Sequence, residues 1–139
     1  MENLGEFIIN HWLLWSILVG FIALLLGSMI SSSMNGAKQV SVAQAVQLVN
    51  QQKARFIDFR DKASFEKEHI ADAIHYSHSA FVAGEIKIDE PQKPVILVTA
   101  TGQSLQPIYK QLQQQEVGDI YQLKGGINAW RDARLPLFN

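Results

Sequence analysis

The sequence predicts a small α/β domain with a mainly parallel central sheet, preceded by one N-terminal transmembrane helix. From residue 39 onwards, segments of strand-forming residues alternate with helical segments of about ten residues, the pattern of a parallel sheet covered by helices. Closer to the N-terminus, residues 12–30 read WLLWSILVGFIALLLGSMI, and Ser16 and Ser28 are their only polar members. These two observations divide the chain into an apolar segment and a folded domain.

The apolar segment has the length of a membrane span. As a helix, its 19 residues would extend about 28 Å, close to the thickness of the hydrocarbon core, and Trp12 and Trp15 suit the headgroup region. One alternative is a buried soluble helix, but the remaining chain is too small to surround a helix that is apolar on every side. The other is a cleaved signal peptide, favoured by small residues at 31–37 but not by residues 1–11, which contain two glutamates and no lysine or arginine. We expect a retained anchor over 12–30, after a short tail over 1–11.

Charge asymmetry predicts the orientation of this anchor. Glu2 and Glu6 precede it, whereas Lys38, Lys53 and Arg55 follow it, and positively charged flanks stay on the cytoplasmic side. The tail is therefore expected outside the cell membrane and the domain in the cytoplasm, as in a single-pass protein of a bacterial inner membrane.

The domain is expected to occupy residues 39–139, after a flexible polar tether over 31–38. Ser41 and Gln44 have the spacing of a capping box, which predicts a helix over 42–51. The segment 94–99 is apolar on both faces and is expected in the middle of the sheet. Further strands are expected at 55–59, 73–76 and 119–123, further helices at 63–69, at 106–116 and from Gly126 to just before Leu135, and an irregular connection over 78–90.

Composition excludes several kinds of function. The net charge of −1 gives no general attraction to nucleic acid, so no nucleic-acid partner is expected. The chain has no cysteine, which rules out disulfides, thiolate metal sites and a protein thiol as nucleophile. His75 and His78 lack a carboxylate at metal-ligand spacing, and we predict neither a metal site nor a cofactor.

Two motifs resemble the rhodanese-like domain family. The first is Ile57-Asp58-Phe59-Arg60, followed by Phe65 and the run His69-Ile70-Ala71-Asp72-Ala73-Ile74. The second is the strand Ile120–Leu123 leading to Gly125-Gly126, then Ala129-Trp130 and Leu135-Pro136. They occur in the family's order and bracket the strand 94–99. The resemblance covers about residues 38–137 and implies a three-layer rhodanese-like domain.

The motif residues are expected to have structural roles. Asp58 and Arg60 should pair at a strand end and hold neighbouring loops, and His69 should donate a hydrogen bond that fixes a loop. Gly125 and Gly126 allow a tight turn after the strand. Trp130 is expected in the core, packing its helix against the sheet.

The loop after the strand 94–99 departs from the pattern of active rhodaneses, whose loop commonly reads Cys-x-x-Gly-x-Arg-Ser. Aligned on Gly102, Thr99 takes the position of the cysteine, Ser104 that of the arginine and Leu105 that of the serine. A thiol with a pKa near 8.5 ionises readily, whereas an alcohol's pKa is many units higher and its oxygen carries no persulfide. The cysteine-dependent phosphatase variant of the fold is excluded for the same reason. The loop is therefore expected to be vestigial and without catalytic residues, over Thr99, Ala100, Thr101, Gly102, Gln103 and Ser104.

The sequence accordingly predicts a membrane-anchored, catalytically inactive rhodanese-like domain that acts as an interaction module. Its expected partners are the membrane itself, through a single helix, and a protein at the membrane surface whose identity the sequence does not give. Two other functions stay open. In the first, the domain is part of a sulfurtransferase pathway in which a partner provides the thiol. In the second, the vestigial loop binds a small anion or metabolite through its backbone amides.

Overall fold

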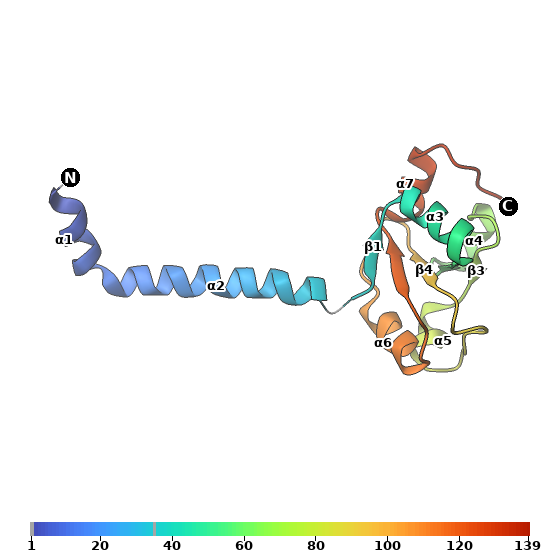
Figure 1. Cartoon of the computed structure of the whole chain (residues 1–139), viewed down its shortest axis with the longest axis horizontal. Coiled ribbons are helices and arrows are strands. Elements are labelled where there is room, and N and C mark those ends of the chain that lie inside the picture. The colour runs from blue at the N-terminus through green and yellow to red at the C-terminus, as the bar shows by residue number, and fades with distance from the viewer. Residues whose placement is uncertain (1, 35) are drawn as a thin grey trace. The chain divides into compact units, whose positions relative to one another are not determined.

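The computed structural model describes residues 2–34 and 36–139 (Figure 1). The described chain divides into two compact units, one N-terminal to Gly36 and one from Gly36 to Asn139. The N-terminal unit consists of helices α1 (Glu2–Asn10) and α2 (Trp12–Met34). The short tail expected over 1–11 is therefore helical where it is described. Helix α2 also continues beyond Ile30, through four residues that the sequence assigned to the tether, because nothing over 31–34 stops a helix that is already formed.

Helix α2 is apolar enough to cross a membrane. Among the described residues it is the one helix that meets this criterion by length and composition, over Trp12–Met29, and none of that window is buried. At 23 residues it extends about 34 Å, which exceeds the roughly 30 Å of a bilayer's hydrocarbon core.

The C-terminal unit confirms the predicted α/β fold with a parallel central sheet. Five strands pair in the order β1-β5-β4-β2-β3, and all four strand pairs are parallel. The strands are β1 (Lys38–Val40), β2 (Arg55–Asp58), β3 (Ile74–His75), β4 (Val95–Val98) and β5 (Ile120–Leu123). The helices are α3 (Val42–Gln52), α4 (Lys62–Lys67), α5 (His78–Val82), α6 (Gln106–Gln114) and α7 (Gly126–Asp132).

Two of these elements were not predicted. Strand β1 lies at the edge of the sheet, paired with β5, and begins within the segment expected to be a flexible tether. Helix α5 lies within the connection expected to be irregular over 78–90; burial of Phe81 in the core holds its single turn in place. The capping box at Ser41 is confirmed, since the Ser41 hydroxyl accepts from Gln44 N and Ser41 N donates to the Gln44 side chain.

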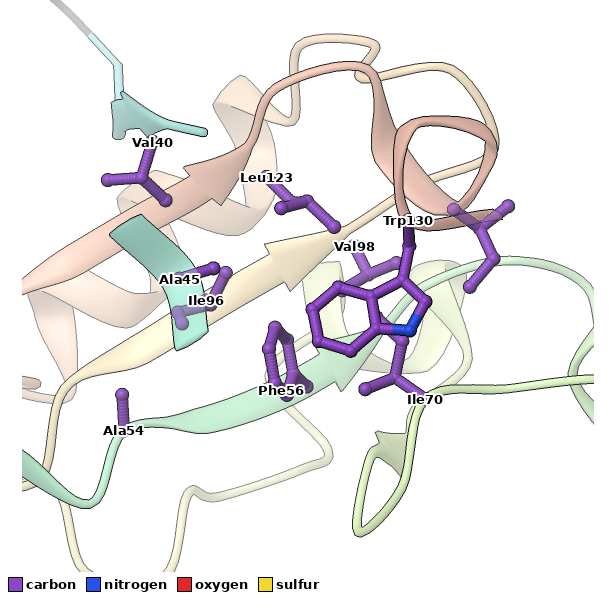
Figure 2. Packing of buried hydrophobic residues seen from close by; sticks show 10 residues of the cluster. Val40, Ala45, Ala54, Phe56, Ile70, Ile96, Val98, Leu123 and Trp130 are labelled. Carbon is purple, nitrogen blue, oxygen red and sulfur yellow. The ribbon is translucent and has the colours of Figure 1, made fainter. Parts of the chain in front are cut away.

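Helices cover both faces of the sheet, which gives three layers. On one face, α3 and α7 pack over a core that contains Phe56, Ile96 and Trp130 (Figure 2). On the other face, α5 and α6 pack over Ile57, Leu97 and their neighbours. Successive residues of β2 and of β4 point to opposite faces, and all four residues of β4 are buried. The central strand β4 thus carries the loop that follows it to a fixed position at the carboxyl edge of the sheet.

Candidate functional site

A cleft of about 510 Å³ lies at the carboxyl ends of β2 and β4. Its walls come from three segments: the residues after β2 together with α4, the loop of residues 99–105 between β4 and α6, and one side of α7. We refer to residues 99–105 as the β4–α6 loop. Thr99, Ala100, Gln103 and Leu105 of this loop line the cleft. This is the edge at which open α/β sheets bind ligands.

The Gly125-Gly126 turn forms a close support for the β4–α6 loop. Gly126 has a φ of +60°, and a Cβ at this position would overlap the Thr99 carbonyl oxygen and lie 2.8 Å from Gly102 N. Gly102 has a φ of +84°, and its Cβ would lie 2.7 Å from Gly125 N. The Thr99 carbonyl also accepts a hydrogen bond from Ile127 N at 2.9 Å. The loop and the turn therefore touch backbone to backbone, which only glycine permits.

Within the β4–α6 loop, side-chain oxygens of the loop itself occupy two backbone amides. Thr99 is 6% exposed, and its Oγ1 accepts a hydrogen bond from Gly102 N at 2.8 Å. Thr101 N donates to Gln103 Oε1 at 3.4 Å. Backbone amides of such a loop are the donors that would otherwise receive an anion. Thr101 and Ser104 are exposed and are not among the residues that line the cleft.

A buried glutamine, which the sequence did not lead us to expect as a site residue, holds the β4–α6 loop against strand β5. Gln122 of β5 is 4% exposed, and its Nε2 donates to the carbonyl oxygens of Gly102, at 3.1 Å, and of Gln103. The sequence signal for this role is the polar Gln122 between the apolar neighbours of a predicted strand. A buried side-chain amide requires hydrogen-bond partners, so such a residue is expected to bond to a nearby loop.

Asp58 and Arg60 form a buried ion pair beside the cleft. Asp58 is 1% exposed, the Arg60 side chain is 7% exposed, and Arg60 Nη2 lies 2.8 Å from Asp58 Oδ2. Asp58 Oδ1 also accepts from Arg60 N at 2.9 Å, and Arg60 Nη2 donates to the Glu68 carbonyl oxygen at 2.7 Å. The pair thus ties the end of β2 to the end of α4. Although Arg60 lines the cleft, these bonds hold its guanidinium in a structural network.

His69 and Trp130 lie outside the cleft and fix the C-terminal segment. His69 exchanges two backbone hydrogen bonds with Phe138, both 2.8 Å long, and its Nδ1 donates to the Phe65 carbonyl oxygen at 2.9 Å. Trp130 packs edge-on against Phe56 with ring centroids 5.3 Å apart (Figure 2), and its Nε1 donates to the Pro136 carbonyl oxygen at 3.2 Å.

The charges around the cleft are mixed and mostly paired. Glu68 and Arg131 form an ion pair, and Arg131 Nη1 also donates to Asn128 Oδ1 at 2.8 Å. Asp61 caps the N-terminus of α4; hydrogen bonds from the Ser64 hydroxyl and then from Ser64 N lower the pKa of its carboxyl group. Within the described residues no group of three or more histidine, aspartate or glutamate side chains is placed to hold a metal ion.

Comparisons with known proteins identify this architecture. Residues 41–133 match the sequence family described as "Rhodanese-like domain". The thiosulfate sulfurtransferase GlpE of Coxiella burnetii is 35% identical over 94 residues, which cover 68% of this chain and 87% of GlpE. YibN of Escherichia coli K12, described as uncharacterized, is 27% identical over 140 residues, which cover 99% of this chain and 97% of YibN. The crystal structure of a rhodanese-related protein from Thermoplasma volcanium superposes with a TM-score of 0.62 at 21% identity, covering 73% of this chain and 97% of that protein.

Proposed function

The chain belongs to the rhodanese-like domain family, and we propose that it is a catalytically inactive, membrane-anchored member that acts as a protein-interaction module. The observation that carries the proposal is Thr99 at the position of the family's cysteine, in a chain without any cysteine. Sulfur transfer in the family needs a thiolate that attacks the donor and then carries the sulfur as a persulfide. A threonine hydroxyl ionises many pKa units higher than a thiol, and each unit corresponds to about 1.4 kcal/mol.

The surroundings of Thr99 support inactivity. Its Oγ1 accepts a hydrogen bond from Gly102 N at 2.8 Å. Within the described residues, no histidine, aspartate or glutamate side chain forms a hydrogen bond with this hydroxyl. The position of the family's arginine is the exposed Ser104, which provides no positive charge toward an anionic sulfur donor. The loop thus keeps the shape of the family's site through Gly102 and Gly126 while lacking its nucleophile and its cation.

Helix α2 supports the membrane anchor. It is uncharged and exposed over the whole window Trp12–Met29, and an apolar surface of that size is unstable in water. The likeness to YibN extends over 99% of this chain and so includes this helix. Lysine and arginine occur only after α2, and this asymmetry favours a domain on the cytoplasmic side of the membrane with the N-terminus outside. Anchoring would raise the local concentration of the domain for partners in the same membrane.

The mouth of the cleft is the contact surface that we propose for the partner. The cleft has a volume of about 510 Å³, and the exposed polar side chains of Gln103 and Lys67 lie among its lining residues. The β4–α6 loop that shapes it is held in place by Gln122 and the Gly125-Gly126 turn. A preformed concave surface of this kind can receive a side chain of a partner protein.

Site-specific photo-crosslinking in native membranes tests this proposal. A photoreactive amino acid is placed at Gln103, in the cleft, and for comparison at the exposed Gln51 of α3. We expect one reproducible protein adduct from position 103 and none from position 51. Absence of any protein adduct from position 103 would contradict the interaction module.

The likeness to GlpE favours a second candidate, in which a partner provides the thiol. This candidate predicts that the chain stimulates thiosulfate-dependent sulfur transfer when the crosslinked partner is added, and that it has no effect on a partner without cysteine. The third candidate, a site for a small anion in the cleft, predicts a rise in the melting temperature of the chain with the concentration of that anion.

A further inference from the structure

Helix α1 has two opposite faces of different character. Leu4, Phe7 and Ile8 are spaced i, i+3 and i+4 and form an apolar stripe that Ile9 widens, whereas Asn3, Glu6 and Asn10 are spaced i, i+3 and i+7 and form a polar stripe on the other side. The apolar stripe is open: Leu4 is 68% exposed, Phe7 57% and Ile8 44%. Most of the stability of an amphipathic helix comes from packing of its apolar face, so the nine residues of α1 need a surface against which to pack.

The position of α1 next to α2 identifies that surface. Only His11 separates the two helices, and helical hydrogen bonds continue across it, from His11 N to the Phe7 carbonyl and from Trp15 N to the His11 carbonyl, both 3.1 Å long. Trp12 and Trp15 open α2 and are the residue type that lies at the boundary between lipid headgroups and hydrocarbon. Once α2 spans a membrane, the end of α1 that joins α2 therefore lies at the headgroup level.

Helix α1 cannot continue the span. The apolar residues 12–30 of α2 already extend about 28 Å, nearly the full hydrocarbon core of roughly 30 Å, and a charged residue such as Glu6 is unfavourable inside the core. The chain bends between the two helices (Figure 1), where His11 Nδ1 donates to the Phe7 carbonyl oxygen at 2.9 Å. This bond is additional to the one that the same carbonyl oxygen accepts from His11 N.

We propose that α1 is an interfacial helix, which lies along the membrane surface opposite the rhodanese-like domain. Its apolar stripe of Leu4, Phe7 and Ile8 contacts the acyl chains, and its polar stripe of Asn3, Glu6 and Asn10 faces the headgroups and water. The ligand of this helix is a lipid surface, and the inference rests on the proposed membrane anchor.

Single spin labels test the depth of each stripe, and the absence of cysteine makes every introduced cysteine unique. The full chain carries Phe7→Cys, Glu6→Cys, Ile22→Cys in the middle of α2, or Lys62→Cys in the domain, and is reconstituted in vesicles of phosphatidylcholine and phosphatidylglycerol. The ratio of collisions with oxygen to collisions with a water-soluble nickel chelate reports depth, whichever way the chain inserts. We expect this ratio to be severalfold higher at position 7 than at position 6, highest at position 22 and lowest at position 62.

Three other outcomes would overturn the interfacial helix. Equal, water-like ratios at positions 6 and 7 with a deep position 22 would overturn the interfacial helix and leave the anchor intact. Equal, deep ratios at positions 6 and 7 would also overturn it, because α1 would then be part of the span. A water-like ratio at position 22 would overturn the anchor and the interfacial helix together.

Discussion

Replacing Gly126 by alanine should displace the β4–α6 loop and destabilise the domain. The residue has a φ of +60°, a conformation that costs an alanine about 1–2 kcal/mol. The new Cβ would also overlap the Thr99 carbonyl oxygen, and moving that oxygen breaks its 2.9 Å hydrogen bond with Ile127 N. A buried carbonyl left without a partner costs a further 1–3 kcal/mol, roughly. Thermal unfolding of the full chain in detergent micelles, followed by near-ultraviolet circular dichroism, should show a melting temperature at least about 8 °C lower.

Gly84→Ala is the matched control for this substitution. Gly84 has a similar φ of +79°, but the nearest atom to its Cβ is Gln111 Nε2, 4.0 Å away. The control therefore carries the backbone strain without the overlap, and it should lower the melting temperature by about 4–8 °C per kcal/mol of strain. Equal losses for the two variants would refute the close support of the loop by the Gly125-Gly126 turn.

Three further substitutions test the residues around the cleft. Asp58→Asn should lower the free energy of unfolding by about 3–5 kcal/mol, because it leaves the buried Arg60 guanidinium without its charged partner; a loss below about 1 kcal/mol in thermal unfolding would contradict the structural ion pair. The pKa of the Asp61 carboxyl group is lower in the folded protein than its usual value of 3.8. The ionised cap therefore stabilises the fold fully at pH values above 3.8, and this stabilisation is lost as the pH falls through the folded-state pKa. The advantage in melting temperature of the native chain over Asp61→Asn should therefore shrink in this acidic range, and an advantage independent of pH would be the contrary result. Gln122→Leu should speed hydrogen exchange in residues 99–105, whereas Gln111→Leu, which removes a bond to the Val82 carbonyl instead, should leave that exchange unchanged.

The sequence contained enough information to predict the core of the fold. The strand β4 is apolar on both faces and could be placed in the middle of the sheet, and the capping box located the start of α3 within the chain. Strand β1 escaped prediction because two of its three residues are exposed and polar, and its partner β5 lies about eighty residues away along the chain. A short edge strand of this kind is defined by its pairing, which local residue preferences do not encode.

The candidate site was predictable in its position but not in its internal contacts. The family pattern placed the β4–α6 loop and the departures at Thr99 and Ser104. The hydrogen bonds from Gly102 N to Thr99 Oγ1 and from Gln122 Nε2 to the loop carbonyls join residues that are 3 and about 20 positions apart. Such bonds depend on how the loop folds against β5, and a single sequence carries no signal for this arrangement beyond the presence of a polar residue in a buried strand.

The mass of the intact protein after incubation with thiosulfate tests the proposed inactivity most directly. We predict that the native full chain keeps its mass, because Thr99 offers an oxygen and the chain has no cysteine. The Thr99→Cys variant should gain the mass of one sulfur atom and lose it again on treatment with cyanide, since the Gly102 amide already points at this side chain. A sulfur adduct on the native chain that cyanide removes would contradict the proposal.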